Sequence, residues 1–400
     1  MKDKIAKLGI FTATQTVYQI GTVLLMAVSV LAGQTIANQI EFASLPLSLV
    51  ILGTLIGLFP ASQWMQKFGR KNGLFLGSAF GVLGAFLSFE GLVSKNFAFF
   101  CIGHLFFGFH QSFLQYLRFV AMESVAKEER ASALSWILVA GIPAAFLGPL
   151  AGFFGKNLFT DQLFAGSYLL LVVAITIQFV LIYFLPNPKP QQKQESIEIE
   201  NFEFRPFSYH IKNPGLWLAV ISSSFGFALM VMLMSAVPVA MKSHGHTMHD
   251  STLVLQWHVL GMYIPSFFSG GLVKRFGSPL LILFGTIILM AEVFAALMGT
   301  GFLPFSVALV LLGIGWNFMF VGGTNLLVEQ YNAIEKNTIQ AINDSSVYLL
   351  ATISTYGAGF LEVKIGWQNL NLVSLPFLVF VFLLSLVYQI RTQKKKSKDS

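Results

Sequence analysis

The stretch Gln66-Lys67-Phe68-Gly69-Arg70 follows an apolar segment and recurs as Lys274-Arg275-Phe276-Gly277, 208 positions further along the chain. A second group of residues repeats at nearly the same spacing. Glu123, Glu129 and Arg130 correspond to Glu329, Glu335 and Lys336, 206 positions later. Two patterns repeated at one spacing predict a chain built from two similar halves.

The composition indicates that lipid surrounds most of this chain. Of its 400 residues, 55% are hydrophobic and only 11% are charged, a balance outside the range of ordinary soluble domains. A helix needs roughly 20 apolar residues to cross a hydrocarbon core about 30 Å thick. The expected fold class is therefore an all-α membrane protein with twelve transmembrane helices in two six-helix repeats. The predicted helices are residues 9–32, 43–62, 73–92, 97–118, 132–154, 165–185, 215–240, 252–270, 279–299, 302–325, 341–362 and 370–390.

The longest hydrophilic stretch lies between the sixth and seventh predicted helices. We expect three parts: an amino-terminal six-helix bundle at residues 1–186, a cytoplasmic inter-bundle loop at 187–214, and a carboxy-terminal six-helix bundle with a basic cytoplasmic tail at 215–400.

The placement of basic residues predicts the orientation, because Lys and Arg are retained on the cytoplasmic side of short loops. With the amino terminus inside, all but four of the 25 basic residues fall on the cytoplasmic side. The exceptions are Lys95, Lys156, Lys242 and Lys364. We therefore expect an inner-membrane protein with both termini on the cytoplasmic side. We also expect that the first helix is not cleaved. The net charge of +7 then needs no nucleic-acid partner.

The loop after the second helix resembles a known pattern. Ser62-x-x-x-Gln66-Lys67-Phe68-Gly69-Arg70-Lys71 is similar to Gly-x-x-x-Asp-Arg-x-Gly-Arg-Arg/Lys of the major facilitator superfamily. Gln66 stands where the family has a gating Asp, and Ser62 replaces a Gly. Further resemblances are His104-x-x-x-Gly108, Gly148-Pro149-x-x-Gly152, Gly313-x-Gly315-Trp316-Asn317, Asn343-Asp344 and Gly366-Trp367.

This resemblance implies a secondary transporter that works by alternating access, with helices one, four, seven and ten lining a cavity. It implies a cytoplasmic gate formed by Gln66, Gly69, Arg70, Arg275 and Gly277. The region around Trp316 implies uptake of a metabolite or vitamin such as riboflavin. The Gly148-Pro149 signature leaves drug or siderophore efflux open as an alternative.

Polar side chains on the cavity-lining helices are the candidate solute-binding residues. Because intramembrane polar groups usually face a cavity or a partner helix, stripes of amides predict a binding site for a small organic solute. The alternative is that these amides form hydrogen bonds that pack helices together. The candidates on these helices are Gln15, Gln19, His104, Gln111, Gln115, Trp316 and Asn317. Gln256 and Tyr263, which share one face of the eighth helix, are added to them.

Two residues are predicted to couple transport to protons. An ordinary histidine titrates near neutral pH, so His104 could take up and release a proton. Glu292 is a carboxyl group deep in the ninth helix. Structural hydrogen bonding is the alternative interpretation for both residues.

The sequence indicates neither a cofactor nor a catalytic site. The group His244, His246, His249 and Asp250 has the spacing of a solvated loop, so no metal site is predicted. The expected partners are a small-molecule solute, protons and membrane lipid, and we expect a monomer. A membrane sensor or scaffold without transport remains the alternative of another class.

Overall fold

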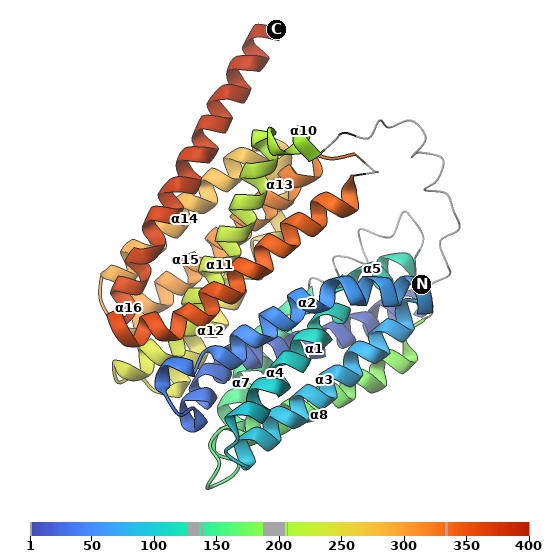
Figure 1. Ribbon diagram of the computed structural model, residues 1–400, viewed down its shortest axis with the longest axis vertical. Helices are drawn as coiled ribbons and strands as arrows, with labels where there is room; N and C mark the ends of the chain where they lie inside the picture. The colour runs from blue at the N-terminus through green and yellow to red at the C-terminus, as the bar shows by residue number, and fades with distance from the viewer. Residues whose placement is uncertain are drawn as a thin grey trace. The chain divides into compact units, whose positions relative to one another are not determined.

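The computed structural model describes residues 2–125, 136–137, 139–186, 205, 207–332 and 335–399. These residues form helices and connecting loops, with no strand among them (Figure 1). The elements are α1 (Lys2–Ile36), η1 (Ile40–Phe42), α2 (Leu45–Phe68), α3 (Arg70–Val93), α4 (Phe97–Leu114), α5 (Leu117–Glu123), α7 (Gly141–Gly155), α8 (Ala165–Phe184), α10 (Phe207–Ile211), α11 (Pro214–Ser243), α12 (Met248–Tyr263), α13 (Ser266–Phe276), α14 (Ser278–Leu297), α15 (Phe302–Val328) and α16 (Lys336–Asp399).

The described helices account for the predicted membrane spans. Nine helical stretches in this part of the chain are long and apolar enough to cross a membrane. The last of them, Thr338–Thr392, contains two spans, because the backbone turns at Gly366 with φ 75° and ψ 170°. The shorter α7 and the α12–α13 pair supply the fifth and eighth spans. The predicted all-α membrane fold is thus confirmed.

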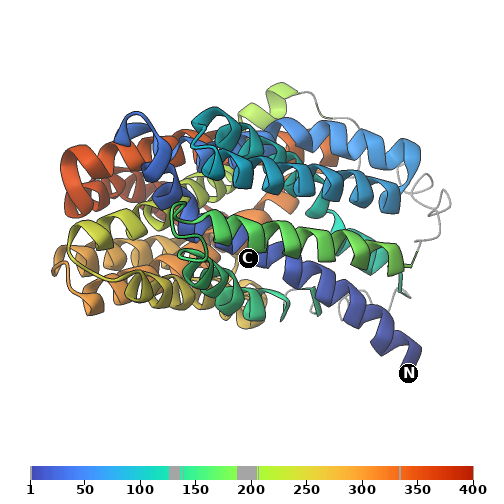
Figure 2. The same ribbon diagram turned by 90° about the horizontal axis from the view of Figure 1, so that it is seen from below.

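The chain divides into two compact units. Unit 1 contains Met1–Gln191, Pro238–Gln256 and Thr355–Val363, and unit 2 contains Gln192–Val237, Trp257–Ser354 and Lys364–Ser400. Within unit 1, α3 and α4 lie side by side in both views (Figures 1 and 2). An apolar cluster that includes Phe11, Leu74 and Phe113 joins α1, α3 and α4.

The sequence repeat corresponds to a repeated backbone turn. Gly69 ends α2 and begins α3 with φ 90° and ψ 153°. Gly277 ends α13 and begins α14 with φ 85° and ψ 155°. Glycine adopts positive φ without the steric cost that a Cβ would bring, so the two halves use the same residue for the same turn.

Candidate solute-binding site

Four aromatic side chains from three helices meet in unit 2, and we call them the aromatic wall. Phe227 of α11 lies 6.2 Å from Trp316 and 6.4 Å from Phe320, both on α15, and 6.1 Å from Tyr348 of α16, measured between ring centroids. Trp316 and Phe320 stack at 5.3 Å with 21° between their planes, because residues four apart share one face of a helix. All four side chains are partly exposed. They therefore present ring surface that a flat solute can contact.

The indole of Trp316 adds a polar group to this wall. Its Nε1 is buried and has no hydrogen-bond acceptor among the residues that the structure describes. A buried donor left unpaired costs about 1 to 3 kcal/mol. A carbonyl oxygen or a ring nitrogen of a solute would remove that cost in a conformation that exposes this N–H.

Asn317 uses most of its amide to support a break in the eighth span. Its Nδ2 donates to Met262 O at 2.9 Å and to Ser266 Oγ at 2.7 Å. The break falls between α12 and α13, where Pro265 has no N–H to continue the helix. Asn317 Oδ1 is buried without a donor in the described part of the chain. The predicted contact with solute would use this oxygen, and it requires a conformation in which Oδ1 is exposed.

Tyr263 and Gln256 fall in different units. Tyr263 is half-buried at the end of α12 in unit 2. Gln256 is buried in unit 1, and its Nε2 donates to Phe146 O at 3.4 Å.

Among the predicted amides on α1 and α4, Gln111 bonds to neighbouring helices. Gln111 donates from Nε2 to Thr22 Oγ1 at 3.1 Å and accepts from Thr54 Oγ1 at 3.2 Å. It thereby joins α1, α2 and α4. Gln115 donates to Ser112 O at 3.2 Å within its own turn. Gln15 is buried and Gln19 is half-buried on α1.

His104 lies inside unit 1 at the centre of a hydrogen-bond network. Its Nε2 is 3.0 Å from both Ser29 Oγ and Tyr168 Oη, and these two hydroxyls are 3.0 Å apart. Its Nδ1 lies 2.8 Å from Phe100 O and 3.3 Å from Ser88 Oγ. Because a carbonyl oxygen can only accept, Nδ1 carries a proton in this arrangement. The network joins α1, α3, α4 and α8.

Glu292 has a different environment. It is 1% exposed on α14, and its Oε1 has no partner within the described ranges. A carboxyl group in such surroundings is costly when ionised.

The predicted gate residues lie at equivalent helix ends of the two halves. Gln66 is exposed, and the guanidinium of Arg70 lies 5.6 Å from the ring centroid of Tyr116. Arg275 is exposed beside Phe276. The counterpart of Arg70 in the second repeat is Ser278, whose hydroxyl donates to Glu329 Oε1 at 3.3 Å.

Asp250, from the histidine-rich segment, has a structural role. Its Oδ2 accepts from Thr247 N at 2.9 Å and from Thr247 Oγ1 at 2.7 Å. These hydrogen bonds lower the pKa of Asp250 and fix the start of α12.

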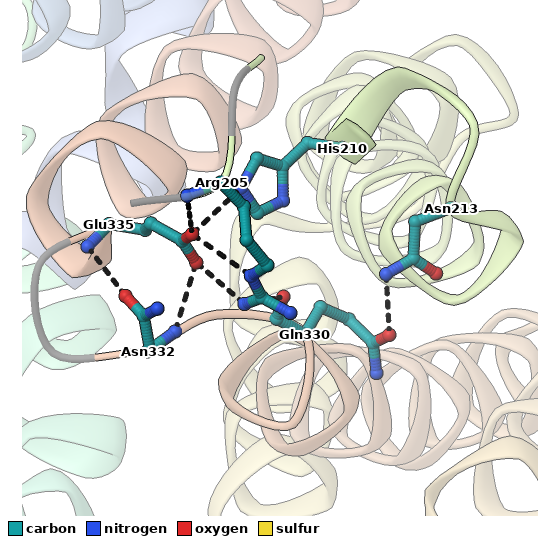
Figure 3. A network of polar contacts seen from close by, with 6 residues as sticks. All are labelled: Arg205, His210, Asn213, Gln330, Asn332 and Glu335. Atoms are coloured by element: carbon teal, nitrogen blue, oxygen red, sulfur yellow. Dashed lines mark hydrogen bonds and ion pairs between the residues drawn. The ribbon is translucent and has the colours of Figure 1, made fainter. Parts of the chain in front are cut away.

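The sequence did not single out the ion pair between Arg205 and Glu335 (Figure 3). From the sequence, Arg205 is one of the basic residues that indicate the cytoplasmic side, and Glu335 is one of the repeated residues. The one available signal was an arginine that follows four glutamates just before the seventh helix.

The sequence and the fold were compared with those of known proteins. Residues 10–291 and 232–400 match the sequence pattern of the Major Facilitator Superfamily. The riboflavin transporter RfnT of Brucella anthropi is 33% identical over 351 residues, covering 88% of this chain and 87% of that protein. The uncharacterized MFS-type transporter YdeG of Bacillus subtilis is 28% identical over 378 residues, covering 89% and 88%. The crystal structure of a D-xylose-proton symporter is similar with a TM-score of 0.73 at 15% identity, covering 95% of this chain and 96% of that one.

The match over the whole chain and the relatives named as transporters show a multi-pass membrane transporter rather than an enzyme. The chain belongs to the major facilitator superfamily, as its sequence resemblance implied.

Proposed function

We propose that this chain carries a flat heteroaromatic solute across the inner membrane, and that riboflavin is the first candidate. The aromatic wall with the indole N–H of Trp316 is the observation that carries this proposal. The 33% identity to a protein named as a riboflavin transporter supports it.

The chemistry of the wall suits such a solute. Offset or edge-on aromatic contacts add about 0.5 to 1.5 kcal/mol beyond the burial of area. The isoalloxazine ring of riboflavin is flat and carries carbonyl oxygens at one edge. It can stack on a ring of the wall and accept a hydrogen bond from the indole of Trp316. An inorganic ion gains little from the same surface, because it has no apolar face to bury against the rings.

A growth assay tests the proposal in cells. A bacterial strain that requires riboflavin and lacks its own uptake is supplied with this chain or with Phe227→Leu or Tyr348→Leu. We expect the unaltered chain to support growth at low riboflavin and each variant to need a higher concentration. Phe294→Leu is the matched control, since Phe294 is 65% exposed on α14 and outside the wall. The proposal would be refuted if the strain expresses the unaltered chain well and still grows no better than the same strain without it.

The orientation and the coupling ion belong to the same proposal. Both termini and the inter-bundle loop are cytoplasmic, as the distribution of basic residues supports. Protons drive transport through His104 or Glu292. Glu292 is the better candidate, because its Oε1 lacks a partner among the described residues whereas both ring nitrogens of His104 are engaged.

A further inference from the structure

Within unit 2, a group of polar residues joins the end of the inter-bundle segment to the residues between α15 and α16 (Figure 3). Arg205 donates from Nε to Glu335 Oε1 at 2.9 Å and from Nη2 to Glu335 Oε2 at 2.6 Å. The backbone N–H of Arg205 and that of Asn332 each donate to this carboxylate at 3.1 Å. We call Arg205, Asn213, Gln330, Asn332 and Glu335 the clasp.

The clasp joins the ends of three helices. At the start of α11, Asn213 Oδ1 accepts from Gly215 N at 2.9 Å, and Asn213 Nδ2 donates to Gln330 Oε1 at 3.1 Å. Gln330 lies two residues after the end of α15 and donates to Leu326 O at 2.9 Å. Glu335 directly precedes α16, and its carbonyl accepts from Ile339 N at 3.0 Å. Arg205 Nη2 donates to Gln330 O at 3.2 Å, which closes the set.

The same three helices carry the aromatic wall. At 1.5 Å per residue, Phe227 lies about 21 Å along the chain from Asn213, Phe320 about 15 Å from Gln330, and Tyr348 about 20 Å from Glu335. Each ring is therefore held on a helix that begins or ends in the clasp. A shift of one helix end against the others would move its ring relative to the other two helices.

The clasp is built to hold its position. Glu335 is only 3% exposed, and its two oxygens receive four N–H bonds from Arg205 and Asn332. His210 Nε2 lies 3.4 Å from Glu335 Oε1 on the remaining side. A bidentate arginine fixes geometry as well as charge. Removing Arg205 would leave the buried carboxylate of Glu335 uncompensated.

We infer that Arg205 and Glu335 are positioning residues for solute binding. They join Gln330, after α15, to the start of α16, and Gln330 in turn holds the start of α11 through Asn213, so that the pair sets the spacing of the aromatic wall. The inference rests on the proposed function of that wall. Neither residue contacts the wall itself.

The test uses the full chain in proteoliposomes with the variants Arg205→Gln, Glu335→Gln and the double variant. Arg391→Gln is the matched control, since Arg391 is exposed on α16 and outside the clasp. We expect each single variant to raise the KM for riboflavin about five-fold or more with a smaller change in kcat, and the double variant to be no worse than either single one. The control should leave both constants unchanged.

A second measurement does not depend on the solute. The emission of Trp316 is obtained as the difference between each protein and the same protein with Trp316→Phe. We expect Arg205→Gln and Glu335→Gln to shift this emission and to increase its quenching by acrylamide, at a temperature well below unfolding.

The outcomes separate the two claims. If unaltered protein takes up no riboflavin but the emission of Trp316 shifts, the proposed function fails and the positioning role stands. If KM and emission are both unchanged in folded Arg205→Gln and Glu335→Gln proteins, the inference is overturned. Should those variants fail to insert, Arg205→Lys keeps the charge and removes the bidentate contact, and it is judged by the same two measurements.

Discussion

Replacing Trp316 by phenylalanine removes the indole N–H of the aromatic wall while keeping an aromatic ring. If this N–H bonds to the solute, its loss costs about 0.5 to 1.5 kcal/mol, which corresponds to a two- to thirteen-fold weaker affinity. Trp316→Leu also removes an aromatic ring that the solute can contact, so a further loss of about 0.5 to 1.5 kcal/mol is expected. The affinity should therefore fall in the order Trp, Phe, Leu.

Titration of riboflavin fluorescence with purified protein measures this series. Riboflavin emission is quenched when its ring stacks on an aromatic side chain, so one experiment reports both affinity and contact. The control is Trp257→Phe, because Trp257 is 53% exposed on α12 and outside the wall. Equal affinities for all four proteins would refute a role for Trp316, and an effect of Trp257→Phe as large as that of Trp316→Phe would show that the loss is unspecific.

Three further predictions concern coupling, acid stability and topology. Glu292→Gln should abolish uptake driven by a pH gradient in proteoliposomes while leaving solute exchange intact. His104→Gln should reduce this uptake less, since the hydrogen bonds of His104 involve four helices. Transport by the unaltered protein that does not respond to a pH gradient would exclude proton coupling through either residue. Arg205 lowers the pKa of Glu335 to about 2, so its contribution to stability is complete above the usual value of 4.5 and is lost as the pH falls towards 2. The melting temperatures of wild type and Glu335→Gln, compared from pH 6 to pH 3, should therefore converge in acid; a constant difference would contradict the ion pair. A cysteine at Ser196 should not react with an impermeant thiol reagent in intact cells, whereas labelling there would reverse the proposed orientation.

Properties set by local sequence could be predicted from the chain. Apolar runs near 20 residues predict spans because the thickness of the hydrocarbon core fixes the length of the helix. The repeated glycines at 69 and 277 predict the same turn because only glycine accepts that backbone conformation at low cost. Trp316 and Phe320 share a face because they are four residues apart.

Properties set by contacts between distant residues could not be predicted in this way. Arg205 and Glu335 are 130 positions apart, and no local pattern indicates that they meet. The helix faces that carry Gln111 and Asn317 could be predicted. The position on a face does not tell which residue of a neighbouring helix forms the hydrogen bond with each amide. Asn317 supports the break after α12, and that role depends on where Pro265 falls opposite α15.

Uptake of labelled riboflavin by the purified chain in proteoliposomes tests the central claim most directly. We predict time-dependent uptake above that of protein-free vesicles. Unlabelled lumiflavin, which shares the flat ring, should inhibit this uptake, and D-xylose should not. Riboflavin entry no faster than in protein-free vesicles, or entry that D-xylose inhibits as well as lumiflavin does, would contradict it.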